Sequence, residues 1–248
     1  MPSTIPVGQT IPYTVIRADL VADRQAIFAV WRQHQTTDPT CRYEWLYGAN
    51  PLGQPLCLLL HDSAGAVIGT TGLVQRDFLC RGSPLRGGHT IDLVVDRTHR
   101  SAGPAVQLQR ALVESVTQSY VSFLYGTPIR AAELVQRRVG FQLLDSLHRW
   151  TKPLRFEKRL QEILPVPALR KIAGYLLDHT AAFLSGEPFF KLNQHWRPTI
   201  ESGFDSRFDA LWSQAKDRFD IIGDRSSAYL TWRFGQGAPA SYRIFSLS

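Results

Sequence analysis

Residues 93–105 combine an apolar strand, a short basic loop and the start of a helix. The apolar run is Leu93-Val94-Val95, and the loop that follows it ends at Arg100. The first turn of a helix has backbone N–H groups without helical partners and the positive end of the helix dipole, so it attracts anions. The small residues beyond Arg100 would let a phosphate approach the backbone, and they are Ser101, Ala102, Gly103 and Ala105 around Pro104. The segment therefore predicts an anion site with the charge of Arg100 at its rim.

Val95 to Ala105, with the spacing Arg-x-x-Gly-x-Ala, resembles the acyl-coenzyme A binding motif of the GNAT N-acyltransferases. The resemblance implies that the amides of Ser101, Ala102, Gly103 and Ala105 hold the pyrophosphate of acetyl-CoA or another acyl-CoA. It also implies that the backbone of Leu93, Val94 and Val95 pairs with the pantetheine arm. Pro104 lies within the same segment, lacks an N–H donor and suits the first residue of a helix.

Residues 125–141 resemble the second motif of the same family, and they end in Arg137-Arg138-Val139-Gly140-Phe141. Gln136 stands where family members commonly have the tyrosine that protonates the departing thiolate. A thiol has a pKa of about 8.5, only about 1.5 units above neutral pH, so the loss of this acid need not abolish turnover.

Asp92 is the candidate general base, because it lies in the strand that leads to the motif, where many GNAT enzymes place a carboxylate. An amine with a pKa of about 10.4 is roughly 4.6 kcal/mol from its reactive neutral form at pH 7, so a base matters. His89 and His99 are further candidates for the base, and Tyr125 is the candidate acid. The alternatives are a strand-end carboxylate at Asp92 and a core aromatic residue at Tyr125.

Hydrophobic periodicity and turn residues predict the elements that position these groups. We expect strands over 12–18, 56–61, 66–73 with an extension over 78–81, 90–95, 120–125 and 141–150, with turns at 82–84 and 87–88. The expected helices are one after Asp19 with the apolar residues Ile27, Phe28, Val30 and Trp31, and others over 42–48, from Pro104 to Val116 and over 131–139. This order resembles the GNAT fold, an α+β fold in which helices flank a mixed, mostly antiparallel sheet.

The expected domains are a GNAT domain over 1–152, a helical linker or insertion over 153–195 and a partial second GNAT-like repeat over 196–248. Within the linker, residues 154–164 and 168–184 look helical. The repeat is suggested because residues 204–212 echo 22–31, and residues 227–247 echo 42–60. Three interpretations stay open: the fragment completes the surface of the first domain, the natural polypeptide continues past Ser248, or the echo is a coincidence.

Composition limits the function classes further. The chain has 28 basic and 21 acidic residues, a net charge of +7, which favours an anionic partner. Its basic residues form no block typical of a nucleic-acid tail, so we do not expect nucleic acid as the partner. The three cysteines lack a Cys-x-x-Cys pair, and we expect no metal site. With no apolar run long enough to span a bilayer and no leader pattern, we expect a cytoplasmic protein.

The resemblance implies an acyltransferase that moves an acetyl or other acyl group from acyl-coenzyme A to an amine of a small molecule or peptide. The alternative is a catalytically inactive GNAT-like domain that binds acyl-CoA or a partner molecule. The sequence does not set the oligomeric state, and a dimer is compatible with it.

Overall fold

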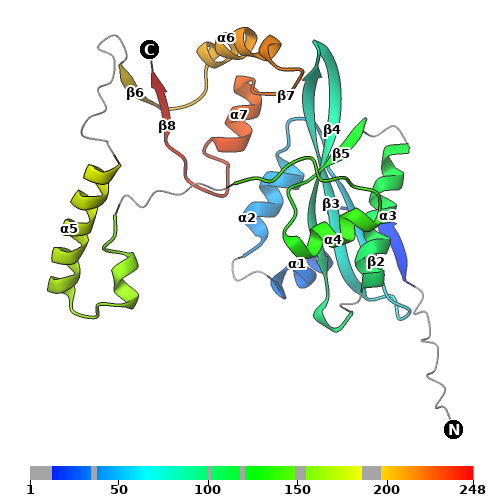
Figure 1. Ribbon diagram of the computed structural model, residues 1–248. Coiled ribbons are helices and arrows are strands. Elements are labelled where there is room, and N and C mark those ends of the chain that lie inside the picture. Colours follow the sequence, from blue (N-terminus) through cyan, green and yellow to red (C-terminus); the bar gives the residue numbers. More distant parts are fainter. Residues whose placement is uncertain are drawn as a thin grey trace. The chain divides into compact units, whose positions relative to one another are not determined.

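The computed structural model describes residues 13–34, 38–99, 102–117, 121–148, 155–185 and 197–247. The chain divides into two compact units. The first consists of Met1–Leu144 and Ser202–Ile244, and the second of Asp145–Glu201 and Phe245–Ser248. The first unit contains the large sheet and its flanking helices (Figure 1).

The sheet of the first unit is mixed and mostly antiparallel. Its strands are β1 (Thr14–Arg17), β2 (Leu56–His61), β3 (Val67–Cys80), β4 (Ser83–Val95), β5 (Phe123–Tyr125) and β7 (Ile221–Gly223). The order is β1-β2-β3-β4-β5, and β7 pairs with β3 near the β3–β4 turn. Among the strand pairs of the described residues in this sheet, β4–β5 is the parallel one and the others are antiparallel. The α+β class predicted from the sequence is confirmed.

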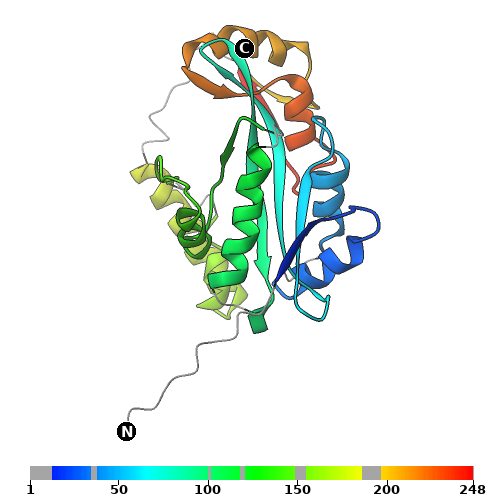
Figure 2. The same cartoon turned by 90° about the vertical axis from the view of Figure 1, so that its right-hand side faces the viewer.

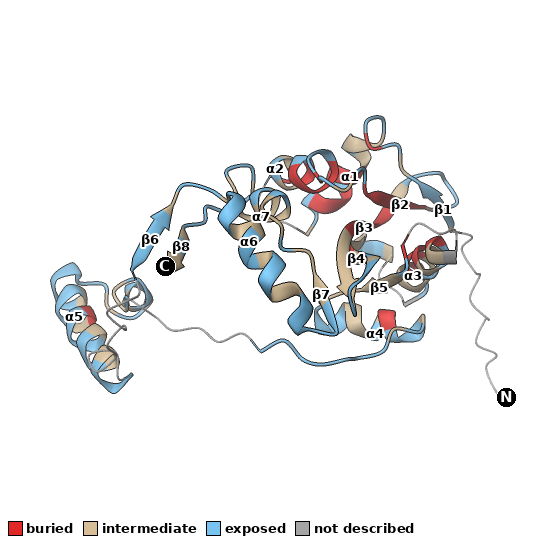
Figure 3. Cartoon of the chain, turned by 90° about the horizontal axis from the view of Figure 1, so that it is seen from above, coloured by how far each residue is buried: buried red, intermediate tan, exposed pale blue. Residues whose placement is uncertain are grey.

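Helices cover both faces of this sheet, as Figure 2 shows. On one face lie α1 (Arg24–Arg32), α2 (Thr40–Tyr43) and the π-helical turn η1 (Glu44–Gly48), while α3 (Ala102–Thr117) packs on the other face with α4 (Arg130–Arg138) beside it. The side chains of β2 point alternately to the two faces of the sheet and contribute to a hydrophobic core on each. Cys57 and Leu59 face α1, and the leucines at 56, 58 and 60 face α3. The buried residues therefore gather around the middle of the sheet (Figure 3).

The C-terminal segment of the first unit packs on the α1–α2 side. It comprises α6 (Ser206–Ala215), η5 (Lys216–Arg218), β7 and α7 (Ser227–Phe234). Trp45 and Trp232 stack at 5.1 Å, and each indole N–H donates to the backbone carbonyl of the other residue, at 2.8 and 3.0 Å. These tryptophans occupy matching places in the sequence echo, Tyr-Glu-Trp-Leu-Tyr-Gly and Leu-Thr-Trp-Arg-Phe-Gly. The two segments that resemble each other in sequence thus contact each other nearly symmetrically within the first unit.

The second unit contains η3 (Arg159–Glu162), α5 (Pro167–Leu184), β6 (Pro198–Glu201) and most of β8 (Ile244–Leu247). The two strands form a small sheet, in which the Ser246 hydroxyl donates to Glu201 at 2.5 Å. These units differ from the expected domains 1–152, 153–195 and 196–248, because the pairing of β7 with β3 joins residues 202–244 to the first unit. Within the described part of the chain, no helix combines the length and apolarity needed to cross a membrane.

Several predicted elements are wrong. Residues 141–148 form no strand, because the chain turns at Gly140, where φ is +99°, and the N–H of Phe141 bonds back to the carbonyl of Gln136 at 3.1 Å. Residues 149 and 150 lie outside the described residues. The expected helix over 154–164 is reduced to the short turn η3.

Gly87 and Gly88 lie inside β4 rather than in a turn. A Cβ on Gly87 would lie 2.7 Å from the ring of Phe123, and one on Gly88 would lie 2.7 Å from Leu73. The two glycines are therefore places where neighbouring side chains cover the strand closely.

Candidate functional site

The candidate site lies where β4 and β5 separate. The parallel pairing runs from Gly87 opposite Phe123 to His89 opposite Tyr125, where β5 ends. β4 continues to Val95, and its residues 90–95 have no ladder partner on the β5 side among the described residues. Backbone N–H and C=O groups on that edge are available to a ligand.

A β-bulge distorts β4 within this unpaired stretch. Thr70 of β3 pairs with Val94 and Gly72 pairs with Ile91, so Asp92 and Leu93 together oppose a single residue of β3. Asp92 has a φ of +52°, in the left-handed region that few residues other than glycine, asparagine and aspartate adopt. The Thr70 hydroxyl donates to the Asp92 carbonyl at 3.1 Å and holds this conformation. The bulge turns the Asp92 side chain toward the α2 side of the sheet.

The Asp92 carboxylate is buried and bonded to two neighbours. It forms an ion pair with Arg42 of α2, and it accepts a hydrogen bond of 3.2 Å from the hydroxyl of Tyr47 in η1. Gly72 makes room for that hydroxyl, since a Cβ there would lie 2.2 Å from it. Burial raises the pKa of Asp92, and Arg42 and Tyr47 oppose the rise. A carboxylate with a raised pKa is a stronger proton acceptor than an exposed one.

The side chains of His89 and Tyr125 lie where β4 and β5 begin to diverge, on the same side of the sheet as Asp92. Their rings stack at 4.9 Å with an angle of 8° between the planes. Burial, followed by the charges of Arg76, Arg233 and Arg42, lowers the pKa of His89 to about 4, so the imidazole is neutral at pH 7. Burial raises the pKa of Tyr125, and the charge and hydrogen bond of Arg76 oppose the rise.

Gln136 reaches the divergence from the α4 side. It is 7% exposed, and its side-chain amide donates to the hydroxyl of Thr90 at 3.0 Å. Gly126 lies directly beside this pair, since a Cβ there would lie 2.6 Å from the Thr90 hydroxyl oxygen and 3.3 Å from the Gln136 nitrogen. Gln136, whose amide N–H is engaged with Thr90, thus stands where the resemblance places a tyrosine that acts as an acid.

The predicted anion segment begins where β4 ends. Leu93 and Val95 pack toward α3, and Val94 packs toward α1. α3 begins at Ala102, so Gly103 and Ala105 are its second and fourth residues, and Pro104 is the third rather than the predicted first. Arg100 and Ser101 lie outside the described residues. His99 lies at this end of β4, with its Nδ1 3.4 Å from the hydroxyl of Tyr13.

The sequence predictions did not include Arg42, Tyr47, Arg76 or Thr90, although these residues contact the candidates directly. Arg42 lies in α2 and Tyr47 in η1, and the apolar residues of this stretch indicate packing rather than a site, while Arg76 lies in the strand β3. Only the three-dimensional pairing of α2 with the bulge connects them to Asp92.

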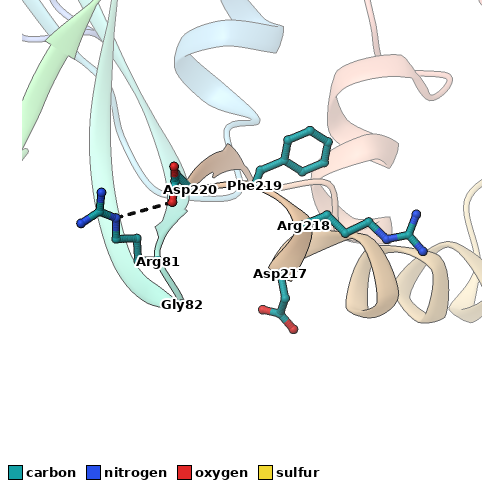
Figure 4. Close-up of a pocket in the computed structure, with 6 residues that line it drawn as sticks. All are labelled: Arg81, Gly82, Asp217, Arg218, Phe219 and Asp220. Carbon is teal, nitrogen blue, oxygen red and sulfur yellow. Dashed lines mark ion pairs between the residues drawn. The ribbon is translucent and has the colours of Figure 1, made fainter.

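Two surface hollows in the described part of the chain lie elsewhere. One, of about 460 Å³, lies at the β3–β4 turn and is lined by Arg81, Gly82, Asp217, Arg218, Phe219 and Asp220. Figure 4 shows its lining and the Arg81–Asp220 ion pair of 3.5 Å. The other, of about 370 Å³, is lined by Asp38, Thr40, Cys41, Glu44, Trp45, Ala49 and Gly237. Neither is lined by Asp92, His89 or Tyr125.

Comparison with solved structures finds several similar chains. A glucosamine-6-phosphate N-acetyltransferase from Arabidopsis thaliana is 14% identical and aligns over 57% of this chain and 98% of its own, with a TM-score of 0.43. A predicted acetyltransferase from Clostridium acetobutylicum, solved with acetyl-CoA, is 16% identical over 56% and 96%, with a TM-score of 0.46.

A GNAT family N-acetyltransferase from Escherichia coli, solved in complex with CoA, is 21% identical over 55% of this chain and 72% of its own, with a TM-score of 0.43. No family model and no curated protein matches the sequence.

Proposed function

We propose that the first unit is an N-acyltransferase that moves an acyl group from acyl-coenzyme A to an amine. The observation that carries the proposal is the free edge of β4 over residues 90–95, which begins at the His89–Tyr125 pair and leads to the first turn of α3. A strand edge can hold the amide groups of a pantetheine arm, and a helix start can hold its pyrophosphate.

The residues of this region suit acyl-CoA as the acyl donor. Gly126 has no side chain to obstruct the end of β5 beside Thr90, and α3 begins with the small residues Ala102 and Gly103. In the proposal, Leu93, Val94 and Val95 pair with pantetheine, the amides of residues 101–105 other than Pro104 bind the pyrophosphate, and Arg100 adds a charge.

The proposed reaction is a direct transfer. The amine nitrogen attacks the thioester carbonyl carbon, a C–N bond forms and the C–S bond breaks. Asp92 accepts the proton that the amine loses, and the sulfur leaves as thiolate and takes a proton from Tyr125 or water. Asp92 is supported by its burial and raised pKa, and Tyr125 by its place at the end of β5.

Two observations favour a second candidate, a domain that binds acyl-CoA without catalysis. Gln136 replaces the usual acid, and the Asp92 carboxylate already accepts bonds from Arg42 and Tyr47. Turnover separates the two candidates, because both include binding of acyl-CoA.

The test combines calorimetric titration with acetyl-CoA and longer acyl-CoAs and an assay of thiol release over a panel of amines. Arg100→Ala should weaken acyl-CoA binding by about tenfold, the loss expected for one charge-assisted contact. Arg110→Ala is the matched control, since Arg110 is an exposed arginine of α3. Absence of binding by any acyl-CoA contradicts both candidates, and binding without turnover leaves only the second.

A further inference from the structure

Arg76 is a partly buried cation without a carboxylate partner among the described residues. It lies on β3 opposite Gly87, two residue pairs along from His89, and it shares a sheet face with His89 and Tyr125. Its Nη2 donates to the backbone carbonyl of Asp224 at 3.2 Å, and its Nε is buried without a hydrogen-bond partner. Burying a cation is costly unless an anion compensates it.

The nearby carboxylates are engaged elsewhere. Asp77 pairs with Arg86 at 2.8 Å. Asp224 accepts from the backbone N–H and the hydroxyl of Ser226, both at 2.8 Å, and Ser226 is the residue that caps α7. The guanidinium of Arg76 instead lies over the ring of Tyr229 at 4.7 Å.

The C-terminal segment builds the wall around this cation. Gly223 of β7 lies flush against Arg76, since a Cβ there would lie 2.5 Å from the guanidinium carbon. Arg233 of α7 lies over the ring of Trp45 at 5.0 Å, and among the described residues it too lacks a carboxylate partner. The charges of both arginines reach His89. Arg76 and Arg233 are thus two cations near the His89–Tyr125 pair that have no carboxylate partner among the described residues. The third cation near His89 is Arg42, and its charge is neutralised by Asp92.

We propose that Arg76, assisted by Arg233, binds an anionic group, a carboxylate or a phosphate, on the acceptor amine. The inference rests on the proposed acyl transfer and adds the substrate class to it. Gly87, opposite Arg76, and Asp92 are five residues apart on β4, on the order of 16 Å of strand, part of which the Arg76 side chain spans. The acceptor is thus an amine whose anionic group lies several bonds from the nitrogen.

The first experiment observes His89 by NMR in the protein without acyl-CoA. Inorganic phosphate and acetate are the two probes. An anion bound at Arg76 offsets the positive charge near His89, so the pKa of the imidazole should rise from about 4 by about one unit. A response to only one probe identifies the preferred anion. No response to either at saturating concentrations overturns the proposal without any variant.

Arg76→Gln should raise the pKa of His89 in the free protein and abolish the response to the probes, and Arg76→Lys should restore part of it. Arg81→Gln is the matched control, because Arg81 directly follows the same strand and its side chain is 80% exposed. If Arg76→Gln retains the full response to the probes, Arg76 does not bind the anion.

The second experiment measures turnover with paired amines that differ only in a carboxylate or its amide, or in a phosphate or its alcohol. We expect the anionic member to have the higher kcat/KM by about 10- to 100-fold, and Arg76→Gln to remove this preference mainly through KM. Equal use of both members overturns the inference and leaves acyl transfer intact. An anion response of His89 without turnover of any amine supports the anion site and contradicts the transferase.

Discussion

Replacing Asp92 with asparagine removes its charge and keeps its size and its tolerance of the left-handed backbone. The Asp92 side chain is 5% exposed and that of its partner Arg42 is 36% exposed. Breaking a fully buried ion pair by removing one partner costs about 3–5 kcal/mol. Because a third of Arg42 already contacts water, we expect a loss of about 1–2 kcal/mol in the free energy of unfolding. The variant should therefore fold, and its kinetics can be interpreted.

The kinetic effect should exceed the loss of stability. Removing a general base typically costs about 10²- to 10⁴-fold in rate. A base acts when deprotonated, so the wild-type kcat/KM should fall as the pH is lowered through the pKa of Asp92, which burial raises above its ordinary value. Asp92→Asn should lack this acid limb and retain the affinity for acyl-CoA, because its side chain faces away from α3.

The assay follows thiol release with a chromogenic reagent, using any amine that the wild type acylates, and urea titration monitored by tryptophan fluorescence gives the stability. Asp77→Asn is the control, since this carboxylate also pairs with an arginine but lies near the β3–β4 turn. A wild-type rate with an unchanged acid limb in Asp92→Asn would refute Asp92 as the base. A rate loss no larger than the unfolded fraction would make its role purely structural.

Three further predictions concern the framework of the site. Trp232→Phe keeps an aromatic ring but removes the donor to the Trp45 carbonyl, so denaturant titration should show a loss of about 1 kcal/mol. Gly72→Ala places a methyl group 2.2 Å from the Tyr47 hydroxyl, so urea titration should show a loss of about 1–3 kcal/mol, with reduced turnover; unchanged stability and rate would contradict the packing argument. For Asp96, bonds from the backbone and hydroxyl of Thr98 lower the pKa to about 2, so its stabilisation is present above its unfolded pKa and disappears as the pH falls through about 2. Asp96→Asn should flatten that acid limb in urea titrations at a series of pH values, and an unchanged limb would exclude Asp96 as its source.

Local patterns predicted the elements that local residues determine. The helical spacing of residues 27–31 predicted α1, and all four predicted apolar side chains there are buried. Gly140 ends α4 as expected, with a positive φ. Both signals depend on neighbours within one or two turns of chain, which a sequence displays directly.

Features that depend on distant segments were not predictable. The left-handed φ of Asp92 follows from the mismatch between β3 and β4, which no residue near it signals. The three-residue strand β7 exists because it pairs with β3, about 140 residues earlier in the chain. The base candidate could thus be proposed from its place before the motif, but Arg42 and Tyr47, which set its environment, could not.

The reciprocal contact of Trp45 and Trp232 has a consequence for how this protein can vary. In a symmetric dimer of identical chains, a contact of this kind would be made by the same tryptophan of both chains, so any substitution would change both sides of the contact. Here each side has its own codon, so one side can be altered while the other is kept. Arg233, next to Trp232, corresponds in the echo to Leu46, which is buried in the core. One half of the contact thereby carries a charged residue while the other half contributes to the core.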